Sequence, residues 1–296
     1  MHSHDHSHSH MHGHHHSSHT HDSSRRIAFA FALNFAFAVI ELVGGIWTQS
    51  VAIQADAIHD FGDSLLLAAA LGLQVWSSAQ AKGRFTFGYK RLSLLSSLAT
   101  SLVLLGGSIY ICATSIERLL NPVTPELNGM LVLAVLGVVV NGVAAWKMGH
   151  GHTQNEKALS WHMIEDLLGW IAVLIGSLVM RFVHAPWIDP VLSLVIAGIV
   201  ITGASRNFWA SSQLFLQAAP NIKLEALKDE LSKVIGIKRL NTLRIWSLDG
   251  AHHVASIHAT LDVSGDSASR ERIKSDLRHV LSHHGHFDVT IEWDEA

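Results

Sequence analysis

Charged residues are distributed very unevenly along the chain, and this limits what the chain can fold into. Residues 27–220 hold only 19 of the 45 Asp, Glu, Lys and Arg residues, whereas the last 76 residues hold 22. A 194-residue stretch with so few charges cannot form a water-soluble domain, because it cannot cover its own surface with polar groups. The sequence therefore predicts an α-helical membrane domain followed by a soluble domain of ordinary composition.

Six apolar segments within this stretch are each long enough to cross a hydrocarbon core of about 30 Å as helices. Their expected ranges are 27–47, 51–77, 92–116, 129–146, 159–183 and 187–204. We therefore divide the chain into a disordered His-rich segment over residues 1–26, a six-helix transmembrane domain over residues 27–209 and a soluble domain over residues 210–296.

The short loops between these segments predict the orientation of the chain. With the N-terminus in the cytoplasm, that side carries nine Lys and Arg residues, and the opposite side carries two, Arg118 and Arg181. Because cytoplasmic loops are enriched in Lys and Arg, both termini and the soluble domain are expected in the cytoplasm. The net charge of −3 gives no reason to expect a nucleic-acid partner, and the single cysteine, Cys112, excludes a disulfide framework.

The soluble domain shows two kinds of periodicity. Apolar residues recur at helical spacing over residues 224–234 and 273–281, and extended runs occupy residues 240–248, 252–263 and 288–293. In the second run apolar and polar residues alternate, which is typical of a strand with one buried face. The order α-β-β-α-β predicts a small two-layer, ferredoxin-like α+β sandwich.

Ionisable residues inside membrane segments are costly, so they indicate functional sites. The second segment contains His59 and Asp63, and the fifth contains His162 and Asp166, so the spacing His-x-x-x-Asp occurs twice. Residues four apart share one face of a helix, so the two pairs converge if the two helices face each other. Two imidazoles and two carboxylates suit a tetrahedral divalent ion such as Zn²⁺. The alternative is that each pair is an isolated hydrogen-bonded couple.

Several motifs resemble those of the cation diffusion facilitator family. They are ELVGG at residues 41–45, ADAIHDFGD at 55–63, FTFGYKR at 85–91 and WIDP at 187–190. The resemblance implies a homodimeric exporter of the inner membrane that moves Zn²⁺ out of the cytoplasm in exchange for protons, with Cd²⁺, Co²⁺, Ni²⁺ or Fe²⁺ as further substrates and no cofactor. The family's transport ligands match His59, Asp63, His162 and Asp166.

A second metal site is expected on the polar face of the soluble sheet. His258, Glu292 and Asp294 share that face if the strands are adjacent, although a solvated polar face is the simpler interpretation. The family often has a histidine in the first strand where this chain has Asn241. His279 and His283 form another i,i+4 pair, which we attribute to coincidence in a chain with 23 histidines.

The N-terminal segment has eleven histidines in its first 21 residues and is expected to collect metal ions near the cytoplasmic entrance of the transport path. Asp60 and Glu165 are expected to point elsewhere on their helices, either into a water-filled cavity or toward another polar group, and Glu41 is expected to line a proton path. A metalloenzyme is disfavoured, because no His-Glu-x-x-His motif occurs and four protein ligands leave no open metal position. The alternative function is that of a membrane metal sensor that binds zinc without transporting it.

Overall fold

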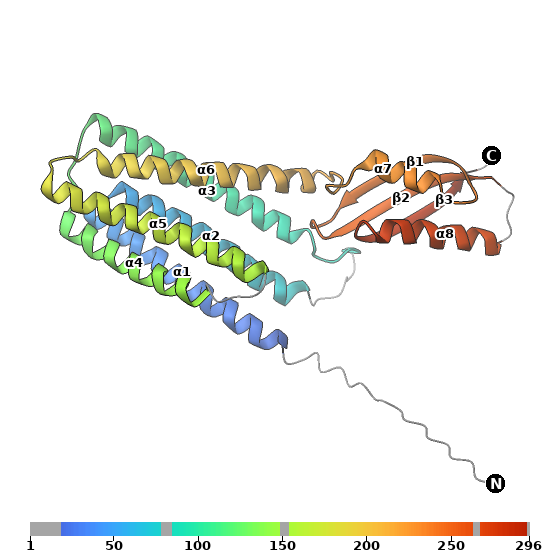
Figure 1. Ribbon diagram of the computed structural model, residues 1–296, viewed down its shortest axis with the longest axis horizontal. Coiled ribbons are helices and arrows are strands. Elements are labelled where there is room, and N and C mark those ends of the chain that lie inside the picture. The colour runs from blue at the N-terminus through green and yellow to red at the C-terminus, as the bar shows by residue number, and fades with distance from the viewer. Residues whose placement is uncertain (1–18, 78–84, 149–153, 263–266, 295–296) are drawn as a thin grey trace, which may run out of the picture.

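The structure is a computed structural model that describes residues 19–77, 85–148, 154–262 and 267–294. A bundle of six long helices forms one end of the molecule, and a small domain of helices and strands forms the other (Figure 1). The long helices are α1 (His19–Thr48), α2 (Val51–Ser77), α3 (Leu92–Leu120), α4 (Leu127–Met148), α5 (Gln154–Phe182) and α6 (Ile188–Phe215).

Four of these helices are long and apolar enough to cross a membrane, judged by length and composition over the described residues. They are α1 over Phe31–Thr48, α3, α4 over Leu127–Trp146, and α6. The apolar run of α2 is interrupted by Asp56, Asp60 and Asp63, and the first part of α5 lies outside the residues whose side chains are described. Both helices lie inside the bundle, since α2 contacts α1, α3, α5 and α6, and α5 also contacts α4 and α6.

Two helices extend beyond their predicted ranges. Helix α1 begins at His19, so it includes residues 19–26 of the segment predicted to be disordered. Helix α6 continues to Phe215, past the domain boundary predicted after residue 209. No Gly or Pro lies between Gly13 and Gly44 or between Gly203 and Pro220 to end either helix, and helix propagation continues once it has begun.

The bundle is held by close approach of helices at small residues. Phe37, Ala134 and Trp170 belong to one buried cluster that joins α1, α4 and α5. A methyl group on Gly137 of α4 would overlap the ring of Trp170, so α4 and α5 can pack at this distance only with glycine there. Between α3 and α6, Ser115 and Ser193 share a hydrogen bond of 2.5 Å.

The small domain contains α7 (Leu224–Ser232), β1 (Ile237–Ser247), β2 (His252–Leu261), α8 (Ser267–Ser282) and β3 (His286–Asp294). This is the predicted order of elements. The strand order is β1-β2-β3, with β1 and β2 antiparallel and β2 and β3 parallel, because α8 forms the crossover between the latter two. Leu227 of α7 and Leu277 of α8 are fully buried against Ile257, so both helices cover one face of the sheet (Figure 1).

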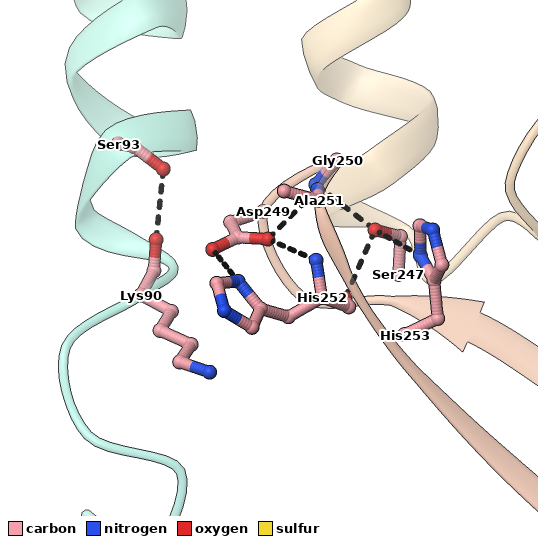
Figure 2. Close-up of polar contacts among 8 residues, drawn as sticks. All are labelled: Lys90, Ser93, Ser247, Asp249, Gly250, Ala251, His252 and His253. Atoms are coloured by element: carbon pink, nitrogen blue, oxygen red, sulfur yellow. Dashed lines mark hydrogen bonds and ion pairs between the residues drawn. The ribbon is translucent and has the colours of Figure 1, made fainter. Parts of the chain in front are cut away.

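The turn between β1 and β2 lies at the end of this domain nearest the helical bundle (Figure 2). Asp249 accepts hydrogen bonds from the backbone N–H groups of Ala251 and His252, and its carboxylate lies 2.8 Å from Nδ1 of His252. Burial alone would raise the pKa of Asp249, but these donors lower it below its usual range. His253 is buried beside Ser247, and burial lowers the pKa of its imidazole.

Candidate metal centre

The predicted transport ligands of α2 and α5 lie at one level of the bundle. Nε2 of His59 is 3.9 Å from Oδ2 of Asp63, one turn further along α2. The same nitrogen is 3.7 Å from Oδ1 of Asp166 on α5. Asp166 is buried, with 7% of its side chain exposed, whereas His59 and Asp63 are partly accessible. The structure therefore brings three of the four predicted ligands together.

The fourth predicted ligand, His162, lies in α5 one turn before Asp166, and its side chain is outside the described residues. Within the part of the chain whose side chains are described, no group of three or more His, Cys, Asp or Glu residues has the arrangement of a metal site. Two ligands 2.1 Å from a tetrahedral ion are about 3.4 Å apart, so a bound ion would draw these donors together by a few tenths of an ångström.

Buried carboxylates surround this level of the bundle. Glu41 of α1 is 0% exposed, neither of its carboxylate oxygens has a hydrogen bond of normal geometry, and it lies close enough to Asp56 and Asp60 to interact with them electrostatically. Asp56 and Asp60 are also buried, and Asp56 faces Gly169 of α5, where a β-carbon would lie 3.8 Å from its Oδ1. Burying several carboxylates together is costly, so these residues are candidates for a functional role.

The structure places the two neighbouring acidic residues, Glu165 and Asp60, differently. Glu165 is exposed although the adjacent Asp166 is buried, so Glu165 points away from the centre as predicted. Asp60 is buried close to Glu41, another polar group, which is one of its two expected placements. Asn34 of α1 donates hydrogen bonds to the backbone carbonyl of Asp60 at 3.0 Å and to the hydroxyl of Ser64 at 3.1 Å, which ties α1 to α2 beside the centre.

Asp189 is a positioning residue that the sequence reasoning did not identify. Its carboxylate, from the first turn of α6, accepts hydrogen bonds from the Ser50 hydroxyl at 2.5 Å and from the N–H groups of Val51 at 2.7 Å and Ala52 at 3.3 Å. It therefore caps the N-terminus of α2, where the first backbone N–H groups have no partner within the helix. His59 lies about two turns after this cap. The available signal was the position of Asp189 in the WIDP motif, at the start of an apolar segment.

The second predicted set lies on the sheet face that α7 and α8 leave uncovered. Nδ1 of His258 is 3.7 Å from Oε2 of Glu292 and 3.6 Å from Oδ1 of Asp294. The parallel register of β2 and β3 causes this by pairing His258 with Glu292. Asn241 donates a hydrogen bond to Asp294 and another to Thr260, so an amide occupies the first-strand position of this group. The Glu292 side chain is 69% exposed, so the cluster of His258, Glu292 and Asp294 is open to solvent.

The other histidines singled out in the sequence lie far from the transport ligands or outside the described residues. His279 and His283 lie at the C-terminal end of α8 with their Nε2 atoms 3.4 Å apart. Residues 1–18, with nine of the eleven N-terminal histidines, lie outside the described residues.

Comparison with known proteins gives a consistent result. The family model described as the cation efflux transmembrane domain matches residues 27–216. A cadmium, cobalt and zinc/H(+)-K(+) antiporter of Bacillus subtilis (strain 168) is 30% identical over 263 residues, which cover 87% of this chain and 85% of that protein. The metal cation efflux system protein CzcD of Cupriavidus metallidurans is 29% identical over 261 residues, covering 87% and 81%. The zinc transporter ZitB of Pectobacterium atrosepticum is 28% identical over 268 residues, covering 88% and 82%.

Proposed function

The chain belongs to the cation efflux family, as its motifs indicated, and from this premise we propose that it exports divalent metal cations in exchange for protons, with Zn²⁺ as its main substrate. The relatives named above are antiporters, efflux proteins and a zinc transporter, which supports transport and gives no support to a sensor. The protein is a transporter and not an enzyme. Zn²⁺, Cd²⁺ and Co²⁺ are substrates here and not cofactors, and Ni²⁺ and Fe²⁺ remain candidates.

The observation that carries this proposal is the short distance between His59 on α2 and Asp166 on α5. Donors from two helices can release an ion when the helices move apart, whereas donors from one helix keep their spacing. We assign His59, Asp63, His162 and Asp166 as the transport ligands. Two carboxylates balance the charge of a divalent ion, so the loaded site is formally neutral and can change its access without a large electrostatic penalty.

Proton coupling follows from the chemistry of these ligands. Imidazole and carboxylate bind metal only when deprotonated, so metal and protons compete for the same atoms. The ion binds while the centre is open to the cytoplasm, and protons from the opposite, more acidic side displace it after the helices have moved. The protonated centre then returns to the conformation that is open to the cytoplasm. Glu41 is our candidate for a proton path, because it is buried beside the centre without a hydrogen bond of normal geometry.

The proposed topology has six membrane crossings, with both termini on the cytoplasmic side of the inner membrane. Helices α2 and α5 are counted as crossings although they carry acidic residues, because they lie within the bundle and the other four helices can shield them from lipid. We propose that the C-terminal domain is ferredoxin-like and joins two protomers of a homodimer. The domain boundary then lies after Phe215, where α6 ends.

Two further metal-handling regions belong to this proposal. His258, Glu292 and Asp294 are candidates for a cytoplasmic site, supported by the distances of 3.7 Å and 3.6 Å from His258 to the two carboxylates. The His-rich segment up to residue 26 is proposed to collect ions before they reach the transport centre, since imidazole is a good ligand for zinc and nickel.

Zinc flux into vesicles that contain the purified protein tests the transport centre. Asp166→Ala and Asp63→Ala should each abolish flux, because each removes one ligand and one of the two charges that balance the ion. Glu165→Ala is the matched control, since this carboxylate is adjacent in sequence to Asp166 but exposed, and its flux should stay normal. Near-normal flux in either aspartate variant would remove these residues from the centre.

A further inference from the structure

We propose that His279 and His283 form a separate cytoplasmic binding site for a borderline divalent cation such as Ni²⁺ or Zn²⁺, in which the two imidazoles chelate the ion and water completes its coordination. From the sequence alone, this i,i+4 pair has no stronger explanation than coincidence in a chain with 23 histidines. The site is on the outer face of α8 and does not depend on the transport centre or on transport itself.

The separation of the two donor atoms carries the proposal. The Nε2 atoms of His279 and His283 are 3.4 Å apart, and the ring centroids are 4.7 Å apart with an interplanar angle of 72°. Two nitrogens each about 2.0–2.1 Å from a tetrahedral ion are about 3.3–3.4 Å apart. The free protein thus already holds the two donors at the spacing that a chelated ion requires.

The packing of α8 keeps this pair on the surface. Ile273, Leu277 and Leu281 are buried on the side that faces the sheet. His279 and His283 lie on the opposite side and are exposed, so an ion and its water ligands can reach both rings. Since the buried leucines hold the helix in place, binding does not require the helix to form or move.

The end of the helix favours a cation at this place. The last turn is tight, because the N–H of His283 donates to the carbonyl of Val280 at 3.3 Å and the N–H of His284 donates to that of Leu281 at 2.9 Å. The final carbonyl groups of a helix give its C-terminus a partial negative charge, which stabilises positive charge nearby. A divalent ion across the last turn therefore benefits from this charge.

The neighbouring charged residues are engaged elsewhere. Nε2 of His284 lies 3.1 Å from Oε2 of Glu230 on α7, and Arg278 lies 3.7 Å from Glu271. No third His, Cys, Asp or Glu ligand completes the pair among the residues that the structure describes. Because water must supply the remaining ligands, this site is expected to bind metal more weakly and to release it more readily than a four-ligand centre.

The competing interpretation is a simple hydrogen bond in which one neutral imidazole donates to the other. That bond also explains a short nitrogen–nitrogen distance, but it predicts no effect of metal on α8. Hydrogen–deuterium exchange of the full chain, measured with and without Ni²⁺, distinguishes the metal site from the simple hydrogen bond by its effect on the end of α8. Metal bound by the other histidines does not confuse the result, because exchange is read peptide by peptide.

With Ni²⁺, exchange of the His283 and His284 amides should slow by about ten-fold, because the chelate stabilises the last turn. His279→Ala and His283→Ala should each remove this effect, and His286→Ala, which changes an exposed histidine outside the pair, should keep it. Exchange across Ile273–Leu277 without metal shows that each variant is folded.

The proposal is overturned if Ni²⁺ leaves exchange in the last turn of the parent chain unchanged. It is also overturned if the slowing persists in both His279→Ala and His283→Ala, since the ion would then be bound by other residues. Slowing that is confined to β2 and β3 would assign the effect to His258 and its neighbours instead.

Discussion

Replacing Asp189 tests whether its carboxylate holds the start of α2 in place. The side chain is 2% exposed and accepts hydrogen bonds from Ser50, Val51 and Ala52. Asp189→Ala removes the acceptor and leaves one hydroxyl and two backbone N–H groups buried without their partner. Water cannot readily replace it, because Ser50, Val51 and Ala52 are themselves 0% exposed.

The expected loss of stability follows from these three bonds. A hydrogen bond to a charged group contributes about 1.5–3 kcal/mol. Because the three share one carboxylate and the site can partly relax, their contributions do not add fully, and we expect a total of about 3–5 kcal/mol. This corresponds to a decrease in melting temperature on the order of 10 °C. Asp189→Asn keeps one acceptor oxygen and should lose about half as much.

Thermal unfolding of the detergent-solubilised protein measures this difference, and Glu126→Ala provides the matched control. Glu126 accepts hydrogen bonds from the N–H groups of Asn128 at 3.2 Å and Gly129 at 2.5 Å at the start of α4, but it is exposed, so water can replace it and the loss should be about 0.5–1 kcal/mol. If Asp189→Ala destabilises the protein no more than Glu126→Ala, the buried cap is not what fixes α2.

Three other predictions concern packing, pH and the N-terminal segment. Gly137→Ala should lower the free energy of unfolding by about 1–3 kcal/mol, because the added methyl group overlaps the buried ring of Trp170. Gly142→Ala in the same helix, whose β-carbon would meet only one atom at 3.7 Å, should be neutral or stabilising in the same thermal assay. Burial lowers the pKa of His253 below the value of 6.5 in the unfolded chain, so unfolding takes up a proton below that pH. Stability measured by thermal unfolding should therefore fall as the pH drops below about 6.5, and His253→Asn should reduce this pH dependence; an unchanged profile would contradict the assignment. Deleting residues 2–18, which removes nine histidines, should reduce initial zinc flux at low zinc and leave flux at saturating zinc unchanged, and a loss at saturation would show that the segment takes part in the transport step.

Local sequence patterns determined a large part of this protein. The low charge of residues 27–220 predicted the six long helices, because the hydropathy of each segment can be read without knowing its neighbours. Periodicity predicted the order α-β-β-α-β for the same reason. The spacing of His59 and Asp63 placed both on one face of α2, since residues four apart are always neighbours on a helix. Helix ends were less predictable, because α1 and α6 extend beyond the apolar runs from which they were predicted.

Only the tertiary structure decided the contacts between distant segments. The bonds from Asp189 to the start of α2 join residues 137–139 positions apart, and no local pattern relates them. The burial of Glu41 depends on how α1 and α2 pack, and a helix pattern cannot tell an inner from an outer polar position in an otherwise apolar segment. The spacing of His279 and His283 was visible in the sequence, but their nitrogen separation depends on side-chain torsions, which residue spacing does not specify.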